Sequence, residues 1–537
     1  MSSVIQPVRQ PAQSAPFVLR LLPSLTDLAF LIPVAIVFAG AGGAPYLLRD
    51  SDTGWHIRTG QWILKNWRVP HSDLFSFSAP GAPWLVHEWL TDAISAWIYN
   101  WGGLAGVVLA SLLLVSLTSA LLFRLVRGKC QNDFVALALT TLAIVEYSLH
   151  WLARPHLVTG LFFVLFLTVL DRLDRKFTKL WLALPALMVL WANLHGGFLA
   201  GMVLIACYIA GELLRALFEP AVDGRMQALR RAGRFASVGG LCALATLLNP
   251  NGFRLHAHVW NLVTDPLTKT LILEFQPFGF GSSEGLLVEF LILAGALGAF
   301  EGLRRKEFAP ALMFVGWCHI ALGSVRHLEL FAIVAAPLAA SGFDSLLQRL
   351  QTASVADYVR RAAAKLANAG AEFRKTDRAW RLHVFSALVL AAVAAALLAP
   401  APGPAFRSEF DPRRFPVQAV DRLGAPVLSH RVFSTDQWGG YLIYRLYPSI
   451  RVFSDGRNND FYSDGFLQSW VDATQAKRGW EDLLARFDIG AILLPVDLPL
   501  VRALKQNARW RVGYDDGTAI LFEPAQGFRA PPPADSR

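Results

Sequence analysis

A short polar segment, Arg49–Arg58, carries two carboxylates two residues apart and an imidazole four residues further on. These side chains belong to Asp50, Asp52 and His56. Carboxylate oxygens suit hard cations such as Mg²⁺ or Mn²⁺, and a carboxylate within reach of a hydroxyl can act as a general base. The segment therefore predicts a divalent-cation site formed by the three residues, or an acid–base site. The alternative is a pair of solvated aspartates at a helix end, with Asp52 as the N-cap.

More ionisable side chains follow in the same polar stretch, among them Asp73, His87 and Glu88. Because they lie on one connection between apolar runs, we expect them to share one aqueous rim. His87 and Glu88 are predicted to contact a substrate there. For Glu88 the alternative is an ordinary surface charge on an amphipathic helix over Trp84–Tyr99.

Two pairs of adjacent or nearly adjacent basic and imidazole side chains occur further along, at Arg154 with His156 and at Arg326 with His327. A guanidinium forms two parallel hydrogen bonds to phosphate oxygens, so both pairs are candidate phosphate-binding sites. The alternative for Arg154 is an interfacial arginine that reaches toward lipid headgroups. His195 precedes Gly196-Gly197, where the backbone can approach a ligand closely, and it is a further candidate binding residue.

Long apolar runs position these side chains. The chain has 537 residues, of which 54% are hydrophobic and only 17% are charged, whereas soluble domains carry about a quarter charged residues. A membrane-spanning helix needs about 20 apolar residues, and the sequence predicts about 11 spans. Their ranges are Leu28–Leu48, Gly102–Phe123, Phe134–Leu149, Leu157–Leu170, Leu180–Leu194, Phe198–Leu217, Phe235–Leu248, Leu286–Phe300, Phe308–Val325, Leu328–Leu346 and Val384–Pro400.

Lysine and arginine gather in alternate connections, which predicts their orientation because cytoplasmic loops are enriched in basic residues. Residues 1–26 are then a cytoplasmic tail, residues 27–400 a transmembrane domain, and residues 49–101 and 249–285 long outer loops. Every candidate residue above falls on the outer side. Since polar groups at membrane depth are costly and usually functional, we expect a site that opens outward. The net charge of +10 reflects this topology, and no nucleic-acid partner is expected.

Residues 401–537 have a soluble composition and predict a small α/β domain outside the cytoplasm. Alternating apolar residues predict strands, and longer periods predict two helices, Trp480–Phe487 and Pro499–Asn507. The predicted strands are Pro426–Phe433, Gly440–Tyr444, Arg451–Phe453, Ile489–Leu494 and Thr518–Phe522. No P-loop or dinucleotide fingerprint is present, so an outer-face reaction would need a substrate that is already activated, such as a lipid-linked sugar.

The chain resembles the GT-C superfamily of integral membrane glycosyltransferases in having many spans, an acidic motif in the first outer loop and a soluble C-terminal domain. The run Asp50–Arg58, followed by Pro70 and Asp73, is similar to the first loop of archaeal oligosaccharyltransferases. The segments Ser434–Tyr441 and Phe453–Arg457 resemble their WWDxG region, although the WWD order is missing. The missing order puts recognition of an asparagine acceptor in doubt and favours an uncharacterised bacterial branch.

This resemblance implies a mainly helical polytopic fold and an inverting transfer from a polyprenyl-phosphate-linked sugar to an acceptor outside the cytoplasm, at a bacterial inner membrane. It implies Asp52 as the general base, supported by Asp50, with a divalent cation as a candidate cofactor. Arg154, His156, Arg326 and His327 would stabilise the departing lipid phosphate, and Trp438 and Tyr441 would hold the acceptor. Two alternatives stay open: a transporter or flippase of lipid-linked glycans, and a non-catalytic glycolipid-binding subunit.

Overall fold

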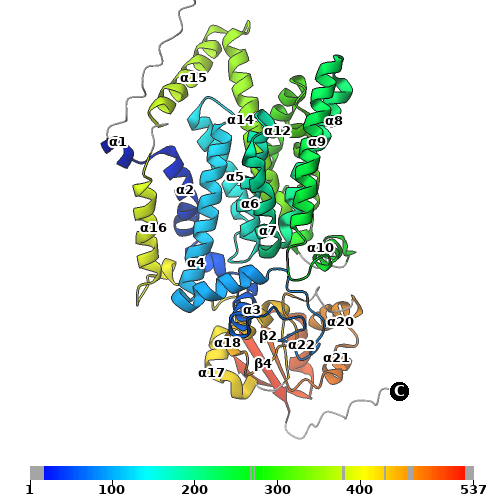
Figure 1. Cartoon of the computed structure of the whole chain (residues 1–537). Helices are drawn as coiled ribbons and strands as arrows, with labels where there is room; N and C mark the ends of the chain where they lie inside the picture. The colour runs from blue at the N-terminus through cyan, green and yellow to red at the C-terminus, as the bar shows by residue number, and fades with distance from the viewer. Residues whose placement is uncertain are drawn as a thin grey trace, which may run out of the picture.

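The computed structural model describes residues 17–525 except 267–268, 270–272, 282, 378–380, 429–430 and 458–463. A bundle of long helices forms one part of the molecule, and a smaller domain containing the β-sheet lies at one end of it (Figure 1). We call this the domain end of the bundle, and the opposite end the far end. Most of the predicted cytoplasmic tail, and residues 526–537, lie outside the described residues.

A helix occupies every apolar run that predicts a span. The helices are α2 (Leu25–Ala35) with the π-helical turn η1 (Ile36–Gly40), α4 (Trp89–Arg127), α5 (Asp133–Ser148), α6 (His156–Arg175), α7 (Ala183–Leu194), α8 (Leu199–Phe218), α9 (Val222–Ala245), α12 (Ser283–Arg304), α13 (Phe308–Gly323), α14 (Leu328–Thr352) and α16 (Val384–Leu397). Among the described residues, five helical segments are long and apolar enough to cross a membrane, namely Trp89–Arg127, His156–Arg175, Gly196–Phe218, Gly285–Arg304 and Val325–Thr352. The chain is therefore a multi-pass membrane protein by length and composition, and the count of about 11 spans stays a prediction.

The first predicted span, Leu28–Leu48, is not one continuous helix. It ends at Gly40, and Gly42 and Gly43 have φ angles of 87° and 98°, a left-handed region that favours glycine. The chain then forms the 3₁₀ helix η2 (Ala44–Leu48). This break turns the backbone just before Asp50 and so places the acidic segment at the domain end.

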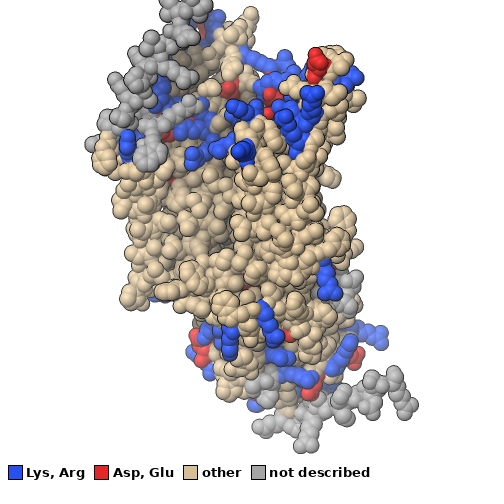
Figure 2. Space-filling view, in the orientation of Figure 1, with Lys and Arg blue, Asp and Glu red and all other residues tan. Residues whose placement is uncertain are grey.

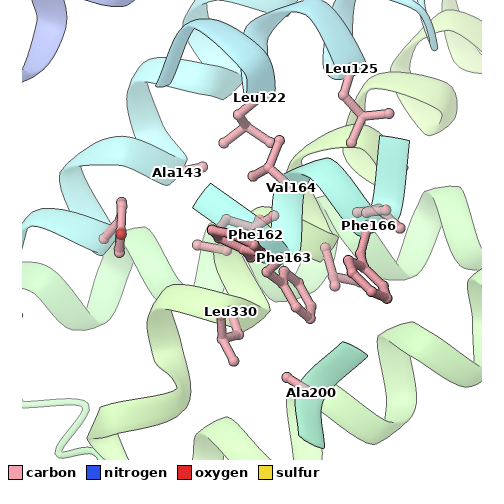
Figure 3. Close-up of a cluster of buried hydrophobic side chains, with 14 of the residues drawn as sticks. Leu122, Leu125, Ala143, Phe162, Phe163, Val164, Phe166, Ala200 and Leu330 are labelled. Atoms are coloured by element: carbon pink, nitrogen blue, oxygen red, sulfur yellow. The ribbon is translucent and has the colours of Figure 1, made fainter. Parts of the chain in front are cut away.

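Close packing of buried aromatic and small residues holds the bundle together. In Figure 3, Phe162, Phe163 and Phe166 of α6 lie among Leu122 and Leu125 of α4, with Ala143, Ala200 and Leu330 nearby. Helices α12 and α14 approach so closely that a Cβ at Gly298 would lie 1.9 Å from the Leu338 carbonyl oxygen. In lipid such close packing, more than the hydrophobic effect, drives helix association.

On the face of the bundle shown in Figure 2, the middle is almost free of charged side chains. Figure 2 shows a broad band without lysine, arginine, aspartate or glutamate, bordered by basic residues at the far end and by the mixed charges of the C-terminal domain. This band is where lipid would contact the helices, because exposed charges within hydrocarbon are costly.

Two surface helices join the bundle to the C-terminal domain. Helix α3 (Asp52–Asn66) packs against the first part of α4, where a Cβ at Gly60 would lie 1.9 Å from the Asp92 carbonyl oxygen. Helix α4 is kinked at Gly103, whose φ is 57°, so its first part, about four turns long, is separated from the apolar remainder. The predicted amphipathic stretch therefore forms a helix from Trp89 onward.

The C-terminal domain has a four-stranded sheet of order β1-β2-β4-β3. Strand β1 (Val432–Phe433) is parallel to β2 (Ala491–Pro495), while β4 (Ala519–Pro524) pairs antiparallel with both β2 and β3 (Trp510–Asp515). The helices are α17 (Val417–Leu428), α18 (Asp436–Leu446), α20 (Asp464–Thr474), α21 (Trp480–Arg486) and α22 (Pro499–Gln506). The two predicted helices are confirmed as α21 and α22, and the predicted strands Ile489–Leu494 and Thr518–Phe522 are confirmed as β2 and β4. Each agrees to within a few residues at its ends.

Three strand predictions need correction. Gly440–Tyr444 is part of α18, whose first turn is capped by the Thr435 side chain, which accepts the Trp438 backbone N–H. Only Val432–Phe433 of the predicted strand Pro426–Phe433 is a strand, with Pro426–Leu428 in α17 and residues 429–430 outside the described part. Arg451–Phe453 forms a single bridge, Val452 to Ser76 of the first long loop. Strand β3 is absent from the predicted strands, although Trp510, Val512 and Tyr514 alternate with Arg511, Gly513 and Asp515 as in a strand with one apolar face.

Candidate active site

Asp50 and Asp52 lie together at the domain end and share one arginine. The Asp50 carboxylate accepts the Asp52 backbone N–H at 2.8 Å, which fixes the turn into α3. One terminal nitrogen of Arg154 lies 3.1 Å from an Asp50 oxygen, and the other lies 3.0 Å from an Asp52 oxygen. Arg154 comes from the connection between α5 and α6, so the fold brings together two segments that the sequence analysis treated separately.

A third carboxylate, Glu274, completes this group, although it was not among the predicted site residues. Its two oxygens lie 3.6 Å from Arg154 and 3.4 Å from Arg326, and His150 Nε2 is 3.6 Å away. Although burial raises the pKa of Glu274, Arg154, His150 and Arg326 outweigh it and hold that pKa at about 2. The sequence contains one signal that could have identified Glu274. It is a lone acid inside the apolar run Leu271–Phe275 of the long loop 249–285.

Asp52 has the electrostatics of a base that works near neutral pH. Burial, followed by the charge of Asp50, raises the pKa of Asp52 to about 8, and Arg154 opposes the shift. A general base is most effective when its pKa is close to the working pH. Asp52 therefore combines burial with a pKa suited to proton transfer.

His56 turns away from the two aspartates. Its Nδ1 lies 2.6 Å from an Asp92 carboxylate oxygen, and its Nε2 lies 3.7 Å from Glu88. Across the described residues, no three histidine, cysteine, aspartate or glutamate side chains converge as metal ligands. Asp50, Asp52 and His56 therefore do not fit one shared cation site in this arrangement, and we assign no step of the reaction to a metal.

Glu88 lies among three imidazoles. The Nε2 atoms of His195, His87 and His56 lie 3.3, 3.6 and 3.7 Å from its carboxylate. The Gly197 backbone N–H donates to His195 Nδ1, so the proton of neutral His195 is on Nε2 and points to Glu88. Burial lowers the pKa of His56 well below its usual value, which keeps that ring neutral. The predicted set His56, His87, Glu88 and His195 is thus brought together.

The other predicted phosphate-binding residues differ in where their side chains lie. Arg326 lies beside Glu274, whereas the His156 ring packs inward. Arg326 contacts Glu274 and lies over the Phe275 ring, and His327 is half-buried beside it. His156 is buried with its Nε2 2.8 Å from the His150 carbonyl oxygen, so its ring packs inward. Arg154 is bound to carboxylates as described above.

The C-terminal domain closes over Asp52 through the segment Asp455-Gly456-Arg457. A Cβ at Gly456 would lie only 2.0 Å from an Asp52 carboxylate oxygen, so only glycine permits this approach. Arg457 is buried, pairs with Asp455 at 2.6 Å and Asp73 at 2.9 Å, and lies 4.4 Å over the Trp84 ring. The domain is thereby tied to the loop that carries Asp73.

Trp438 and Tyr441, the predicted acceptor residues, lie in the core of the C-terminal domain. Both side chains are almost fully buried; Trp438 donates to the Arg414 carbonyl oxygen at 2.8 Å, and the Tyr441 hydroxyl accepts from Arg445. The structure does not bring them to Asp52, and their role toward an acceptor stays a prediction.

Comparison of the sequence with family models finds no match, and comparison with curated proteins finds none. Solved structures do match. The apo form of an oligosaccharyltransferase from Archaeoglobus fulgidus aligns with a TM-score of 0.52 at 12% identity, covering 94% of this chain and 74% of that one. ArnT from Cupriavidus metallidurans in the apo state aligns with a TM-score of 0.44 at 12% identity, covering 92% and 97%.

The alignment with the oligosaccharyltransferase extends over both the helix bundle and the C-terminal domain, because it covers nearly the whole chain. At 12% identity it bears on the fold alone. The expected fold, many apolar helices followed by a C-terminal domain, is confirmed: this chain has a fold similar to that of the archaeal oligosaccharyltransferase.

Proposed function

We propose that this protein is a membrane glycosyltransferase that moves a sugar from a polyprenyl-phosphate-linked donor to an acceptor outside the cytoplasm. The observation that carries the proposal is Asp52. It is buried at the domain end between Arg154 and Gly456, its pKa is raised to about 8, and the chain around it has a GT-C fold.

In the proposed reaction the acceptor hydroxyl oxygen attacks the anomeric carbon of the donor sugar. The bond from that carbon to the phosphate oxygen breaks on the opposite face, so the configuration inverts. The hydroxyl proton passes to Asp52, and the lipid phosphate leaves with the electron pair. A positioned base of this kind contributes about 10²–10⁴-fold to the rate.

Arg326 and His327 are the proposed partners of the leaving phosphate. Arg326 is half-buried and is held by Glu274 on one side, which leaves part of its five-donor guanidinium for a phosphate. Fixed cations help most where charge develops in the transition state. Glu88 and its three histidines, His56, His87 and His195, are proposed to bind sugar hydroxyls.

The proposed orientation has the N-terminus in the cytoplasm and the C-terminal domain outside, in the bacterial inner membrane. Two observations support it. Basic residues border the far end of the bundle in Figure 2, as expected for a cytoplasmic surface. The candidate site lies at the other end, beneath the C-terminal domain.

The test is sugar transfer in membranes supplied with radiolabelled polyprenyl-phosphate sugars, comparing the wild type with Asp52→Asn. We expect Asp52→Asn to lower transfer by about 10²–10⁴-fold, because the amide cannot accept the proton. The matched control is Asp421→Asn, which removes an exposed carboxylate paired with Arg445 and should transfer normally. Equal transfer by wild type and Asp52→Asn would remove Asp52 from the mechanism. No transfer by the wild type with any donor would favour a glycolipid-binding subunit.

A further inference from the structure

Arg154 is surrounded by carboxylates. Its terminal nitrogens lie 3.1 Å from Asp50, 3.0 Å from Asp52 and 3.6 Å from Glu274. The Arg154 side chain is only 18% exposed, and the Asp52 side chain only 11%. The oxygens that face Arg154 on both aspartates are the ones a bridging divalent cation would need.

The backbone of Ala153, directly before Arg154, is anchored to the segment that carries the aspartates. The Ala153 N–H donates to the Leu47 carbonyl oxygen at 2.8 Å, and the Thr53 hydroxyl donates to the Ala153 carbonyl oxygen at 3.1 Å. These two hydrogen bonds fix the backbone next to Arg154. The position of the guanidinium therefore does not depend on a flexible side chain alone.

A guanidinium and a metal ion would compete for this place. Two carboxylates that contact the same guanidinium repel each other, and a buried carboxylate without a partner is strongly destabilising. Arg154 supplies the compensating charge permanently, because arginine does not lose its proton in proteins. A divalent ion placed between the same oxygens would meet this fixed positive charge.

We propose that Arg154 is the resident cation of the site and holds Asp50 and Asp52 in the place of a divalent metal. Arg154 is then a positioning residue for the base, and sugar transfer proceeds without added metal. This inference rests on the proposed function for its catalytic part, but the occupancy of the cation site is testable without any donor or acceptor.

The experiment is Mn²⁺ binding to the full chain purified in detergent, followed by electron paramagnetic resonance, which distinguishes free from bound Mn²⁺. We expect no saturable binding by the wild type. Arg154→Ala leaves the carboxylates unpaired and should bind about one equivalent of Mn²⁺, because carboxylate oxygens suit this ion. Asp50→Asn or Asp52→Asn introduced into Arg154→Ala should abolish that binding.

Two further variants control for charge and for folding. Arg154→Lys keeps a cation at the same place and should not bind Mn²⁺. Arg326→Ala removes the other arginine on Glu274 but leaves the contacts of Arg154 with the aspartates, so it should not bind Mn²⁺ either. Gel filtration identifies any variant that fails to fold, and saturable Mn²⁺ binding by the wild type or by Arg154→Lys would overturn the inference even if Arg154→Ala does not fold.

Saturable Mn²⁺ binding by the wild type that is lost in Asp50→Asn or Asp52→Asn would overturn the inference, and so would a folded Arg154→Ala that binds no Mn²⁺. Transfer assays supply a separate readout: wild-type transfer should be unchanged by EDTA. If no variant transfers sugar, the proposed function fails while the Mn²⁺ titrations still decide whether Arg154 occupies the cation site.

Discussion

At the scale of single residues, the surroundings of the proposed base, Asp52, set its pKa. Asp52 is buried beside a second carboxylate, and both conditions favour its protonated form. Arg154 favours the ionised form from 3.0 Å away. The balance leaves the carboxylate able to change its protonation state close to physiological pH.

The pH dependence of transfer follows from this balance. Because the pKa of Asp52 is raised to about 8, the residue is protonated, and inactive as a base, below that pH. We expect kcat/KM to rise with pH and to level off above about 8. In Asp50→Asn the neighbouring negative charge is lost, so the midpoint should move to lower pH. A profile that is flat, or that is identical in Asp50→Asn, would contradict the assignment of Asp52 as the base.

At the scale of elements, helix α3 packs between the bundle and the C-terminal domain, and glycines allow its close contacts. A Cβ at Gly54 would lie 2.5 Å from the Gly440 carbonyl oxygen of α18, and a Cβ at Gly456 would strike the Asp52 carboxylate. These contacts allow the C-terminal domain to reach Asp52, so the domain forms one wall of the site.

Gly456→Ala should therefore disturb Asp52 directly. The added methyl group cannot fit 2.0 Å from the carboxylate oxygen, so either the side chain or the segment must move. A displacement of about 1 Å at a reacting group can cost about 10²-fold in rate, and we expect a loss of transfer of that order. Gly465→Ala is the matched control, because nothing lies within 4 Å of its Cβ position. Wild-type kinetics of Gly456→Ala would show that the Asp52 contact is not required.

The attachment of the C-terminal domain depends on Arg457. Its replacement in Arg457→Ala would leave Asp73 and Asp455 buried without this partner, at a cost of about 3–5 kcal/mol in the free energy of unfolding. Arg413→Ala is the control, since Arg413 pairs with Asp411 on the surface with its side chain 88% exposed. Thermal unfolding of the full chain in detergent measures both variants. Equal unfolding temperatures for Arg457→Ala and the wild type would show that the buried triad does not hold the domain.

At the scale of the whole molecule, the charge distribution separates two aqueous faces by an uncharged band. The buried ionic site lies entirely at the domain end. An enzyme built in this way would meet its lipid-linked donor from within the bilayer and its acceptor from the aqueous side of the C-terminal domain.

This orientation predicts which surfaces a membrane-impermeant maleimide reaches in intact cells. In a variant with Cys130, Cys207, Cys242 and Cys318 replaced by serine, a new cysteine at Arg413→Cys should be labelled, because it lies on the exposed surface of the C-terminal domain. Arg361 belongs to helix α15 (Asp357–Asp377), which lies at the far end in Figure 1, and its side chain is 74% exposed. A cysteine at Arg361→Cys should be labelled only after the cells are opened. The reverse pattern would invert the proposed topology.

The sequence by itself determined the polytopic helical class and the grouping of the ionisable residues. Helix formation and hydropathy depend on neighbours within a few turns, so each apolar run predicted a helix that is present. The same local signals placed Asp50, Asp52, Arg154, Glu88 and His195 outside the spans. They failed for α18, where a helix of small and aromatic residues resembles a strand.

Only the tertiary structure decided which of these side chains meet. Arg154 and Asp50 are 104 residues apart in the chain, and Arg457 and Asp73 are further apart still. Such pairings depend on how helices pack and how loops close, and no local periodicity carries that information. For this reason the sequence suggested a metal between the aspartates and a phosphate beside Arg154, whereas the fold places the guanidinium directly on the carboxylates.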